Sequence, residues 1–129
     1  MTQTKFDIND SLIEEFDIND SLIEDWLTQT RNKSQMVDEK VKAIFLHILK
    51  IFQDVGPIAA RDRLPRNRIK HLFDDIWEIR AHQYRIAYFW DGSVCVLVHG
   101  IRKKTNEWPL KEIKLVKTRK KNYFEHKRQ

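Results

Sequence analysis

The sequence predicts an α+β fold in which two N-terminal helices pack on a small antiparallel sheet that is followed by a C-terminal helix. Three observations predict this class. Apolar residues recur at helical spacing up to Gly56-Pro57, three segments of strand-forming residues follow, and an amphipathic segment begins at Pro109. A chain of 129 residues suffices for one such domain with a modest core.

The N-terminal region contains the same nine residues twice, FDINDSLIE at 6–14 and again at 16–24. Each copy includes a Ser-Leu-Ile-Glu segment, the capping box in which a serine and a glutamate satisfy the first N–H groups of a helix. An apolar face continues beyond the second copy, so we expect a helix over about 20–30. The residues of this face are Leu22, Ile23, Trp26 and Leu27.

The two copies are not expected to lie on one helix. They are ten residues apart, and at about 100° per residue the second apolar face is turned some 80° from the first. The first copy is therefore interpreted as a separate turn or an acidic arm, and a duplication without function is the alternative. The chain then divides into an acidic, repeat-containing N-terminal arm over 1–19 and a domain over 20–129.

Charge is divided unevenly along the chain. Residues 1–26 contain eight acidic residues and one lysine, a net charge of −7, whereas the remainder contains 23 basic and 11 acidic residues, a net charge of +12. A domain this basic attracts phosphate backbones and acidic partners. A basic surface that serves only solubility is the alternative.

The composition also bears on the compartment. No apolar run approaches the ~20 residues that span a membrane, and the first residues, MTQTKFDIND, lack the basic-then-apolar order of a secretory signal. We therefore expect a cytoplasmic protein that does not enter a membrane. The single cysteine, Cys95, lies in an apolar run and is expected to be a buried structural thiol.

A second helix, expected over about 36–55, is the clearest element of the sequence. Eight apolar residues from Val37 to Val55 recur at helical spacing, and Gly56-Pro57 ends the pattern. A basic connection is expected over 58–70. Its basic residues are Arg61, Arg63, Arg66, Arg68 and Lys70.

Three antiparallel strands are expected next, in the segments DDIWEIR, YRIAYFW and VCVLVHGI. Asp91-Gly92 predicts a tight hairpin between the last two. Pro109 suits the first turn of the final helix, whose later turns are rich in Lys and Arg. We expect the helices to cover one face of this sheet.

The hydrophobic pattern predicts the register of the first hairpin. We pair Ile79 with Tyr84 and Glu78 with Arg85, because a slip by one residue would move charged side chains into the core. Arg80 and Arg85 then stand together on the face away from the core.

The second hairpin extends this face into a cationic surface. Because side chains alternate between the two faces along a strand, Arg102 is expected on the same face as Arg80 and Arg85. Two lysines follow where the strand ends, and the basic connection is nearby. Guanidinium groups make bidentate contacts with phosphate, so the surface suits RNA, and a solvated charged face is the alternative. The expected surface consists of Arg80, Arg85 and Arg102 with one or both of Lys103 and Lys104.

His99 is the first candidate for an acid or base, because imidazole changes its charge near neutral pH. The predicted register pairs it with Tyr84 on the core side, unless a bulge at His99-Gly100 turns it over. A histidine satisfied within the core and a proton-transfer residue are the two interpretations. His82 lies in the first hairpin turn and could equally be a surface residue. No Cys pair or paired His at ligand spacing indicates a metal site.

Taken in order, the segments IWEIR, YRIAYFWDGSVCVLVHGIRKKT and PLKEI resemble the phage-derived HigB-like toxins of bacterial type II toxin–antitoxin systems, within the RelE/ParE superfamily. The resemblance extends from about Leu22 to Tyr123 and is specific over 77–113. It implies a RelE/ParE-like fold and a toxin that cleaves mRNA at the ribosome without a metal or another cofactor. It also implies two kinds of partner, a helix-turn-helix antitoxin, and mRNA with the ribosome.

The resemblance also implies residue roles. A ribose 2′-hydroxyl attacks the adjacent phosphate, a lysine or histidine transfers protons, and arginines hold the developing charge. By position, the residues implied in catalysis are Arg80, Arg85, His99 and Lys103. Together with the charge pattern, the RNA-binding residues expected are Arg102, Lys104, Arg61, Arg63, Arg66 and Arg68.

Two other functions stay open. A member of the superfamily can block a protein such as gyrase without cutting RNA, and a basic module can bind RNA or an antitoxin without catalysis. The chain also departs from the family at its start, where a first strand usually precedes the first helix. The acidic repeat stands there instead, so the sheet lacks an edge strand or KFDI forms a short one.

Overall fold

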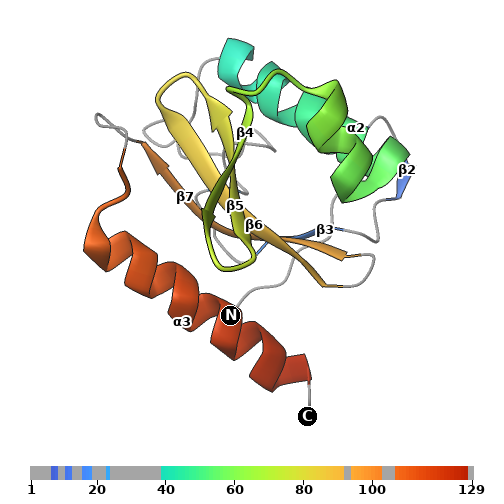
Figure 1. Ribbon diagram of the computed structural model, residues 1–129. Helices are drawn as coiled ribbons and strands as arrows, with labels where there is room; N and C mark the ends of the chain where they lie inside the picture. The colour runs from blue at the N-terminus through green and yellow to red at the C-terminus, as the bar shows by residue number, and fades with distance from the viewer. Residues whose placement is uncertain are drawn as a thin grey trace.

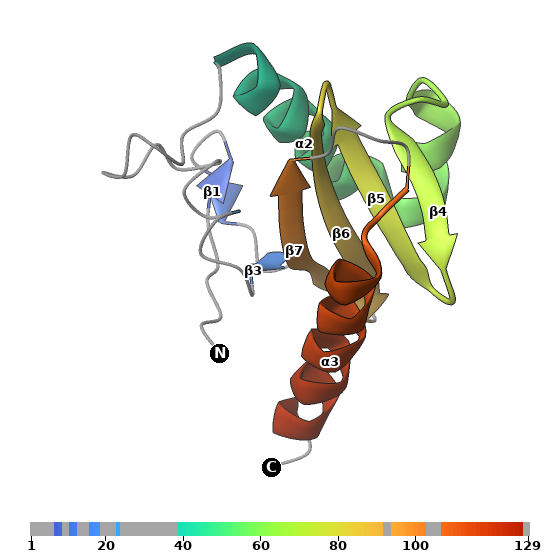
Figure 2. The same cartoon turned by 90° about the vertical axis from the view of Figure 1, so that its left-hand side faces the viewer.

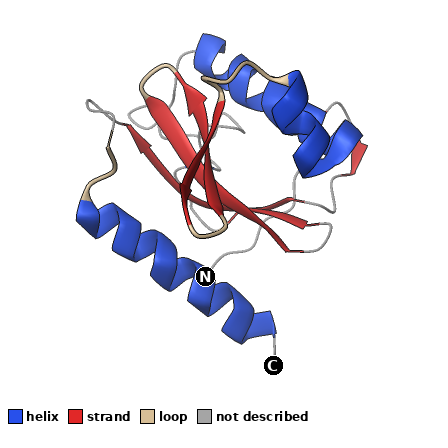
Figure 3. Cartoon of the chain, in the orientation of Figure 1, coloured by secondary structure: helices blue, strands red, loops and turns tan. Residues whose placement is uncertain are grey.

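The computed structural model describes residues 7–8, 11–12, 16–18, 23, 39–91, 94–102 and 107–127. Helix α2 (Glu39–Arg63) is followed by four antiparallel strands and by helix α3 (Leu110–Lys127) (Figure 1). The four strands are β4 (Ile69–Phe73), β5 (Ile76–Ala81), β6 (Tyr84–Asp91) and β7 (Val94–Arg102). The short strands before α2 are β1 (Asp7–Ile8), β2 (Ser11–Leu12) and β3 (Phe16–Ile18). The predicted α+β class is confirmed (Figure 3).

The main sheet has the strand order β3-β7-β6-β5-β4. Strands β4 to β7 form an antiparallel meander, and β3 pairs in parallel with β7 at the edge. The edge strand therefore comes from the second copy of the repeat. The KFDI segment of the first copy contributes Asp7–Ile8 to β1, which pairs with β2 outside the main sheet.

The sheet lies between α2 and α3, which cover opposite faces (Figure 2). The expectation that the helices share one face is therefore wrong. The physical reason lies in the central strands, where four consecutive residues of β6 and six of β7 are buried. Such continuous burial means that both faces of a strand are covered.

The α2 face holds the larger apolar core. Phe45, Ile48 and Phe52 of α2 are buried with Ile86 and Tyr88 of β6. Each such side chain contributes about 1.5–3 kcal/mol when fully buried. Cys95 is buried in the same cluster, so the predicted structural thiol is confirmed, and burial raises its pKa.

The α3 face has a second core of its own. Val116 and Tyr123 of α3 pack on Phe89, Val96 and Val98 of the two central strands. The Tyr123 hydroxyl also donates a hydrogen bond to an Asp91 carboxylate oxygen at 2.9 Å. The C-terminal helix is thereby held against the sheet by apolar contacts and by a polar one.

Helix α2 confirms the predicted second helix and continues beyond it. Gly56 departs from helical geometry, at φ 81° and ψ 179°, and a further helical segment runs from there to Arg63. Glycine adopts positive φ without a steric cost, and Pro57 suits the start of a helix. Gly56-Pro57 therefore kinks the helix, and the first part of the expected connection 58–70 is helical.

Strand β4 was not expected, because the predicted basic connection included its first residues. Its partner β5 follows after a two-residue turn in which Asp74 has φ 49°. Aspartate tolerates this left-handed conformation better than most residues. Of the helix predicted over 20–30, the structure describes Ile23, which is helical and fully buried. The rest of that helix lies outside the described residues, and the division of the chain at residue 19 stays a prediction.

The register of the first hairpin differs from the prediction by two residues. Arg80 lies opposite Arg85, whereas the prediction placed Glu78 there. A shift of two keeps every side chain on its predicted face. The cause is the turn, which contains only His82 and Gln83 and therefore brings the strands together earlier than expected.

A β-bulge in the second hairpin has a larger effect. Tyr88 pairs with Leu97, but the preceding residue on β6, Ala87, pairs with His99. Val98 is therefore an extra residue on β7. A bulge of one residue reverses the facing of all residues beyond it. His99 therefore lies on the α3 face, as the sequence predicted for a bulge, although the bulge comes one residue earlier than His99-Gly100.

Arg102 is also affected by the bulge. It lies opposite Tyr84, on the α2 face, so the prediction that it shares a face with Arg80 and Arg85 is wrong. Its guanidinium carbon is 5.7 Å from the centre of the Tyr84 ring, within the range of a cation–π contact. Its Nε donates a hydrogen bond to Gln83 Oε1 at 3.2 Å.

Candidate nucleic-acid interface

A polar pocket lies where the β5–β6 hairpin meets the turn before β4. The backbone N–H of Arg80 donates to the Arg68 carbonyl oxygen at 2.7 Å, which ties the turn to the hairpin. The pocket has a volume of about 360 Å³. We call it the arginine pocket, and its lining residues are Asn67, Arg68, Arg80, His82 and Arg85. Three of the predicted residues, Arg68, Arg80 and Arg85, are thereby brought together.

A buried carboxylate stands behind two of these arginines. Glu78 is 1% exposed, and its oxygens lie 3.4 Å from Arg80 Nε and 3.6 Å from Arg85 Nε. Neither Nε makes a hydrogen bond within the described part of the chain, so these are electrostatic contacts at longer range. Trp108 Nε1 completes the arrangement by donating to Glu78 Oε2 at 3.0 Å.

The positive charge of the pocket is only partly balanced. Burial lowers the pKa of Arg85, the charge of Arg80 lowers it further, and Glu78 acts in the opposite direction. An arginine nevertheless keeps its proton in a protein. One carboxylate therefore faces two guanidinium groups, and a bound anion would supply the missing negative charge.

Arg85 also shapes the hairpin turn. Its Nη1 donates to the carbonyl oxygens of His82 at 2.5 Å and Tyr84 at 2.9 Å. The guanidinium is thus held from two sides, by the turn and by Glu78. Such preorganisation lets it contact a ligand with little further loss of side-chain freedom.

His99 lies in a separate polar cluster between β7 and α3, which we call the histidine cluster (His99, Glu112 and Arg119). Arg119 Nη1 donates to His99 Nδ1 at 2.9 Å and to the Val98 carbonyl oxygen at 3.0 Å. Since a guanidinium only donates, Nδ1 is the acceptor, and the ring proton belongs on Nε2. That nitrogen donates to Glu112 Oε2. Both ring nitrogens of His99 are therefore engaged.

Trp108 connects the two sites. Its indole N–H binds Glu78, and its ring centre lies 6.2 Å from that of His99. Sequence reasoning missed Trp108, Glu112 and Arg119. A usable signal was present, because Glu112 and Arg119 fall at helical spacing on the stripe of α3 that contains Val116. Charged residues at such positions indicate buried polar partners.

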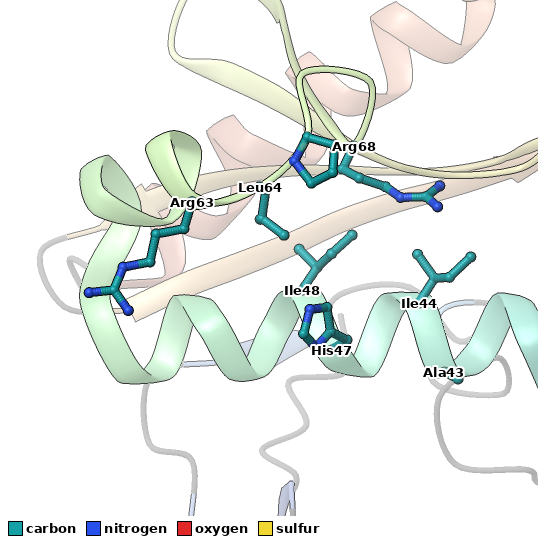
Figure 4. A pocket seen from close by; sticks show the side chains of 8 residues that line it. Ala43, Ile44, His47, Ile48, Arg63, Leu64 and Arg68 are labelled. Atoms are coloured by element: carbon teal, nitrogen blue, oxygen red, sulfur yellow. The ribbon is translucent and has the colours of Figure 1, made fainter.

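A second pocket is lined by Arg63, which does not line the arginine pocket (Figure 4). It has a volume of about 330 Å³ between α2 and the turn that follows it, and Ile44, Ile48 and Leu64 supply its apolar part. Arg63 and Arg68 both line it, and their guanidinium groups point away from one another (Figure 4). Arg68 is therefore shared by the two pockets, whereas Arg63 contributes to this one.

The remaining predicted residues are dispersed. Arg61 places its guanidinium 4.2 Å from the centre of the Trp77 ring on the α2 face, a cation–π contact. Arg66 is exposed in the turn before β4. Lys103 and Lys104 lie outside the described residues. Within the described ranges, no three His, Cys, Asp or Glu side chains gather where they could bind a metal ion, and no helix is apolar enough to cross a bilayer.

Comparison with known families gives a match to the phage-derived Gp49-like proteins (DUF891) over residues 34–121. This range includes α2, the four antiparallel strands, both polar sites and most of α3. The order of helices and strands is compatible with a RelE-like fold. No curated protein matches the chain. Because the family match covers most of the chain, the protein belongs to the phage-derived Gp49-like family, a family of RelE/HigB-like toxins.

Proposed function

We propose that this protein is the toxin of a type II toxin–antitoxin system and acts as a ribosome-dependent mRNA endoribonuclease. The arginine pocket is the observation that carries the proposal. It gathers three guanidinium groups from two segments of the chain, with one buried carboxylate as partial counter-charge. Planar guanidinium groups are suited to the oxygens of a phosphodiester.

The placement of Arg80 and Arg85 supports a function rather than stability. They lie directly opposite one another on neighbouring strands. Like charges in such pairs destabilise a sheet. Natural proteins keep such locally unfavourable pairs mainly at functional sites.

The reaction proposed is transesterification within the mRNA strand. A 2′-hydroxyl attacks the adjacent phosphorus, and the phosphate gains negative charge in the transition state. Arg80 and Arg85 stabilise that charge, because they are already held in position and are partly shielded from water. Glu78 and Trp108 act through the arginines and are positioning residues.

Lys103 keeps the catalytic role and Lys104 the phosphate-binding role that the resemblance implies. Both directly follow β7. The ribosome contributes by presenting the mRNA with its 2′-hydroxyl in line with the bond that breaks. A helix-turn-helix antitoxin is the partner that silences the toxin. A domain this basic attracts acidic partners, and an acidic surface on the antitoxin would suit it.

The proposal is tested by mapping cleavage of a defined mRNA by primer extension, with and without translating ribosomes. Wild-type cuts that require ribosomes are expected. Arg85→Ala should lower the cleavage rate by about 100-fold, the usual loss for one donor to a developing oxyanion. Lys50→Ala is the matched control, because Lys50 lies on α2 in an exposed ion pair with Asp54 and should not affect cleavage.

Intact mRNA in every lane, from folded protein that still binds its antitoxin, would overturn the nuclease proposal. A supercoiling assay with gyrase would then test the alternative in which the toxin blocks a protein. Cleavage that persists unchanged in Arg85→Ala would instead remove the arginine pocket from the mechanism.

A further inference from the structure

The proposed cleavage needs a base for the 2′-hydroxyl proton, and His99 is poorly placed to serve. The residue is 8% exposed between β7 and α3. Its Nδ1 accepts a hydrogen bond from Arg119, and its Nε2 donates to Glu112. To take a proton from a substrate, His99 would first have to break one of these contacts.

The arginine pocket contains another imidazole. Its described lining consists of three arginines, Asn67 and His82. Guanidinium groups stay protonated in proteins, and a carboxamide is not a base. Of the described residues that line this pocket, His82 is therefore the one whose side chain can act as a general base.

The backbone holds His82 beside the arginines. It is the first residue of the two-residue turn and has φ 54°, a region where glycine or asparagine would cost less. Arg85 Nη1 donates to the His82 carbonyl oxygen at 2.5 Å, so an arginine of the pocket also fixes the turn. His82 is exposed, and a substrate reaches it without displacing another element. A two-residue hairpin turn commonly has positive φ at its first residue, so the turn itself fixes the backbone of His82.

We propose that His82 is the general base of the cleavage reaction, an inference that rests on the proposed function. Its neutral imidazole takes the 2′-hydroxyl proton as O2′ forms its bond to phosphorus. The bond between phosphorus and O5′ breaks, and O5′ leaves with the electron pair and takes a proton from water. The imidazolium returns its proton to the resulting hydroxide. The products are a 2′,3′-cyclic phosphate and a 5′-hydroxyl end.

The test measures single-turnover cleavage of ribosome-bound mRNA by full-length His82→Gly. Glycine is favourable at this positive φ, so the turn and the arginines are expected to keep their structure. The rate should fall by about 100-fold or more, as for loss of a general base. Added imidazole should restore part of it. Asp74→Gly is the matched control, because Asp74 is the other non-glycine residue with positive φ in the described chain and does not line this pocket.

Two further readouts separate a base from other roles. Binding to ribosomes that carry mRNA with a 2′-deoxyribose at the cleavage site should be the same for wild type and His82→Gly. A substrate with sulfur in place of O5′ has a leaving group that needs no protonation. The ratio of the wild-type cleavage rate to that of His82→Gly should therefore be the same on this substrate as on normal mRNA.

Each result decides between these roles. If His82→Gly cleaved the sulfur substrate as fast as the wild type does, His82 would be an acid and the inference would be overturned. Weaker binding of His82→Gly that accounts for its whole loss of cleavage rate would also overturn it. Unchanged cleavage by His82→Gly would also overturn it and leave the proposed function intact. Absence of ribosome-dependent cleavage by the wild type would overturn the proposed function and the inference together.

Discussion

Glu78 offsets the repulsion between Arg80 and Arg85. The two arginines lie opposite one another, and their Nε atoms are 3.4 and 3.6 Å from the carboxylate. Trp108 holds the same carboxylate from the other side. A single buried acid therefore orients two cations while leaving net positive charge for a ligand.

Glu78→Gln tests this role. Glutamine keeps the size of the side chain and an oxygen that accepts from Trp108, but it removes the counter-charge of two largely buried arginines. The free energy of unfolding should fall by about 3 kcal/mol, as when one partner of a buried ion pair is removed. Urea denaturation followed by circular dichroism measures it.

Asp54→Asn is the control for Glu78→Gln. Asp54 also pairs with a cation, Lys50, but both side chains are largely exposed and 3.9 Å apart. An exposed pair of this kind contributes at most about 1 kcal/mol, and usually less. Equal losses for the two variants would mean that Glu78 does not act as the counter-charge.

Gly56 sets the course of the longest helix. Its φ of 81° interrupts α2, and the segment after it leads to Leu64 and the turn that contains Arg68. The kink thereby directs the chain toward the arginine pocket.

Gly56→Ala is expected to destabilise the fold by about 1–3 kcal/mol, the cost of a backbone with positive φ and ψ near 180° for a residue with a Cβ. The reason is conformational, because a Cβ placed on Gly56 meets no atom within 4 Å. Thermal unfolding measures the loss. Ile58→Ala is the control in the same helix, and because Ile58 is 70% exposed it should change stability by less than about 0.5 kcal/mol.

The bulge at Val98 assigns the residues of β7 to their faces. Val98 and His99 both turn toward α3, where His99 meets Glu112 and Arg119. Beyond the bulge, Arg102 turns toward Tyr84 on the α2 face. Bulges commonly re-aim side chains near functional sites, and here one separates His99 from the core of α2.

Charge is the property of the entire chain that bears most directly on RNA. The first 26 residues have a net charge of −7 and the remainder +12. Opposite charges within one molecule compete with a polyanion for the basic surface, and salt screens this effect over about 10 Å at 0.1 M.

Deletion of residues 1–15 removes four acidic residues and one lysine. The truncated protein should bind single-stranded RNA more tightly at low salt, by several-fold, and the difference should vanish as salt increases. Fluorescence anisotropy with a labelled RNA at several salt concentrations checks this. Equal affinity of the two proteins at low salt would indicate that the duplication has no role in RNA binding.

Much of the fold followed from local patterns. Apolar spacing predicted α2, and strand-forming segments predicted β5, β6 and β7. The two arginines of the hairpin were placed on one face despite a register error, because a shift of two residues preserves the face of each side chain. Strand β4 was missed because its first residues, Ile69 and Lys70, fall within the segment 58–70 that was interpreted as a basic connection.

The candidate site was only partly foreseen from sequence. Arg68, Arg80 and Arg85 were among the predicted residues and do meet in one pocket. Their counter-charge and its tryptophan were not foreseen, because Trp108 lies 30 residues from Glu78 along the chain. A contact over such a distance depends on how α3 docks, which no local pattern encodes.

The sequence alone thus determined the type of most elements (α2, β5, β6, β7 and α3), the charge and the placement of two arginines on one face, since each depends on residues that are near one another in the chain. Tertiary structure alone decided that α3 covers the face of Arg80 and Arg85, and that the bulge at Val98 turns His99 toward it. The physical reason is that both outcomes depend on packing between distant segments. One extra residue in a strand moves every side chain beyond it to the opposite face of the sheet. The position of that residue depends on how side chains pack against α2 on one face and against α3 on the other.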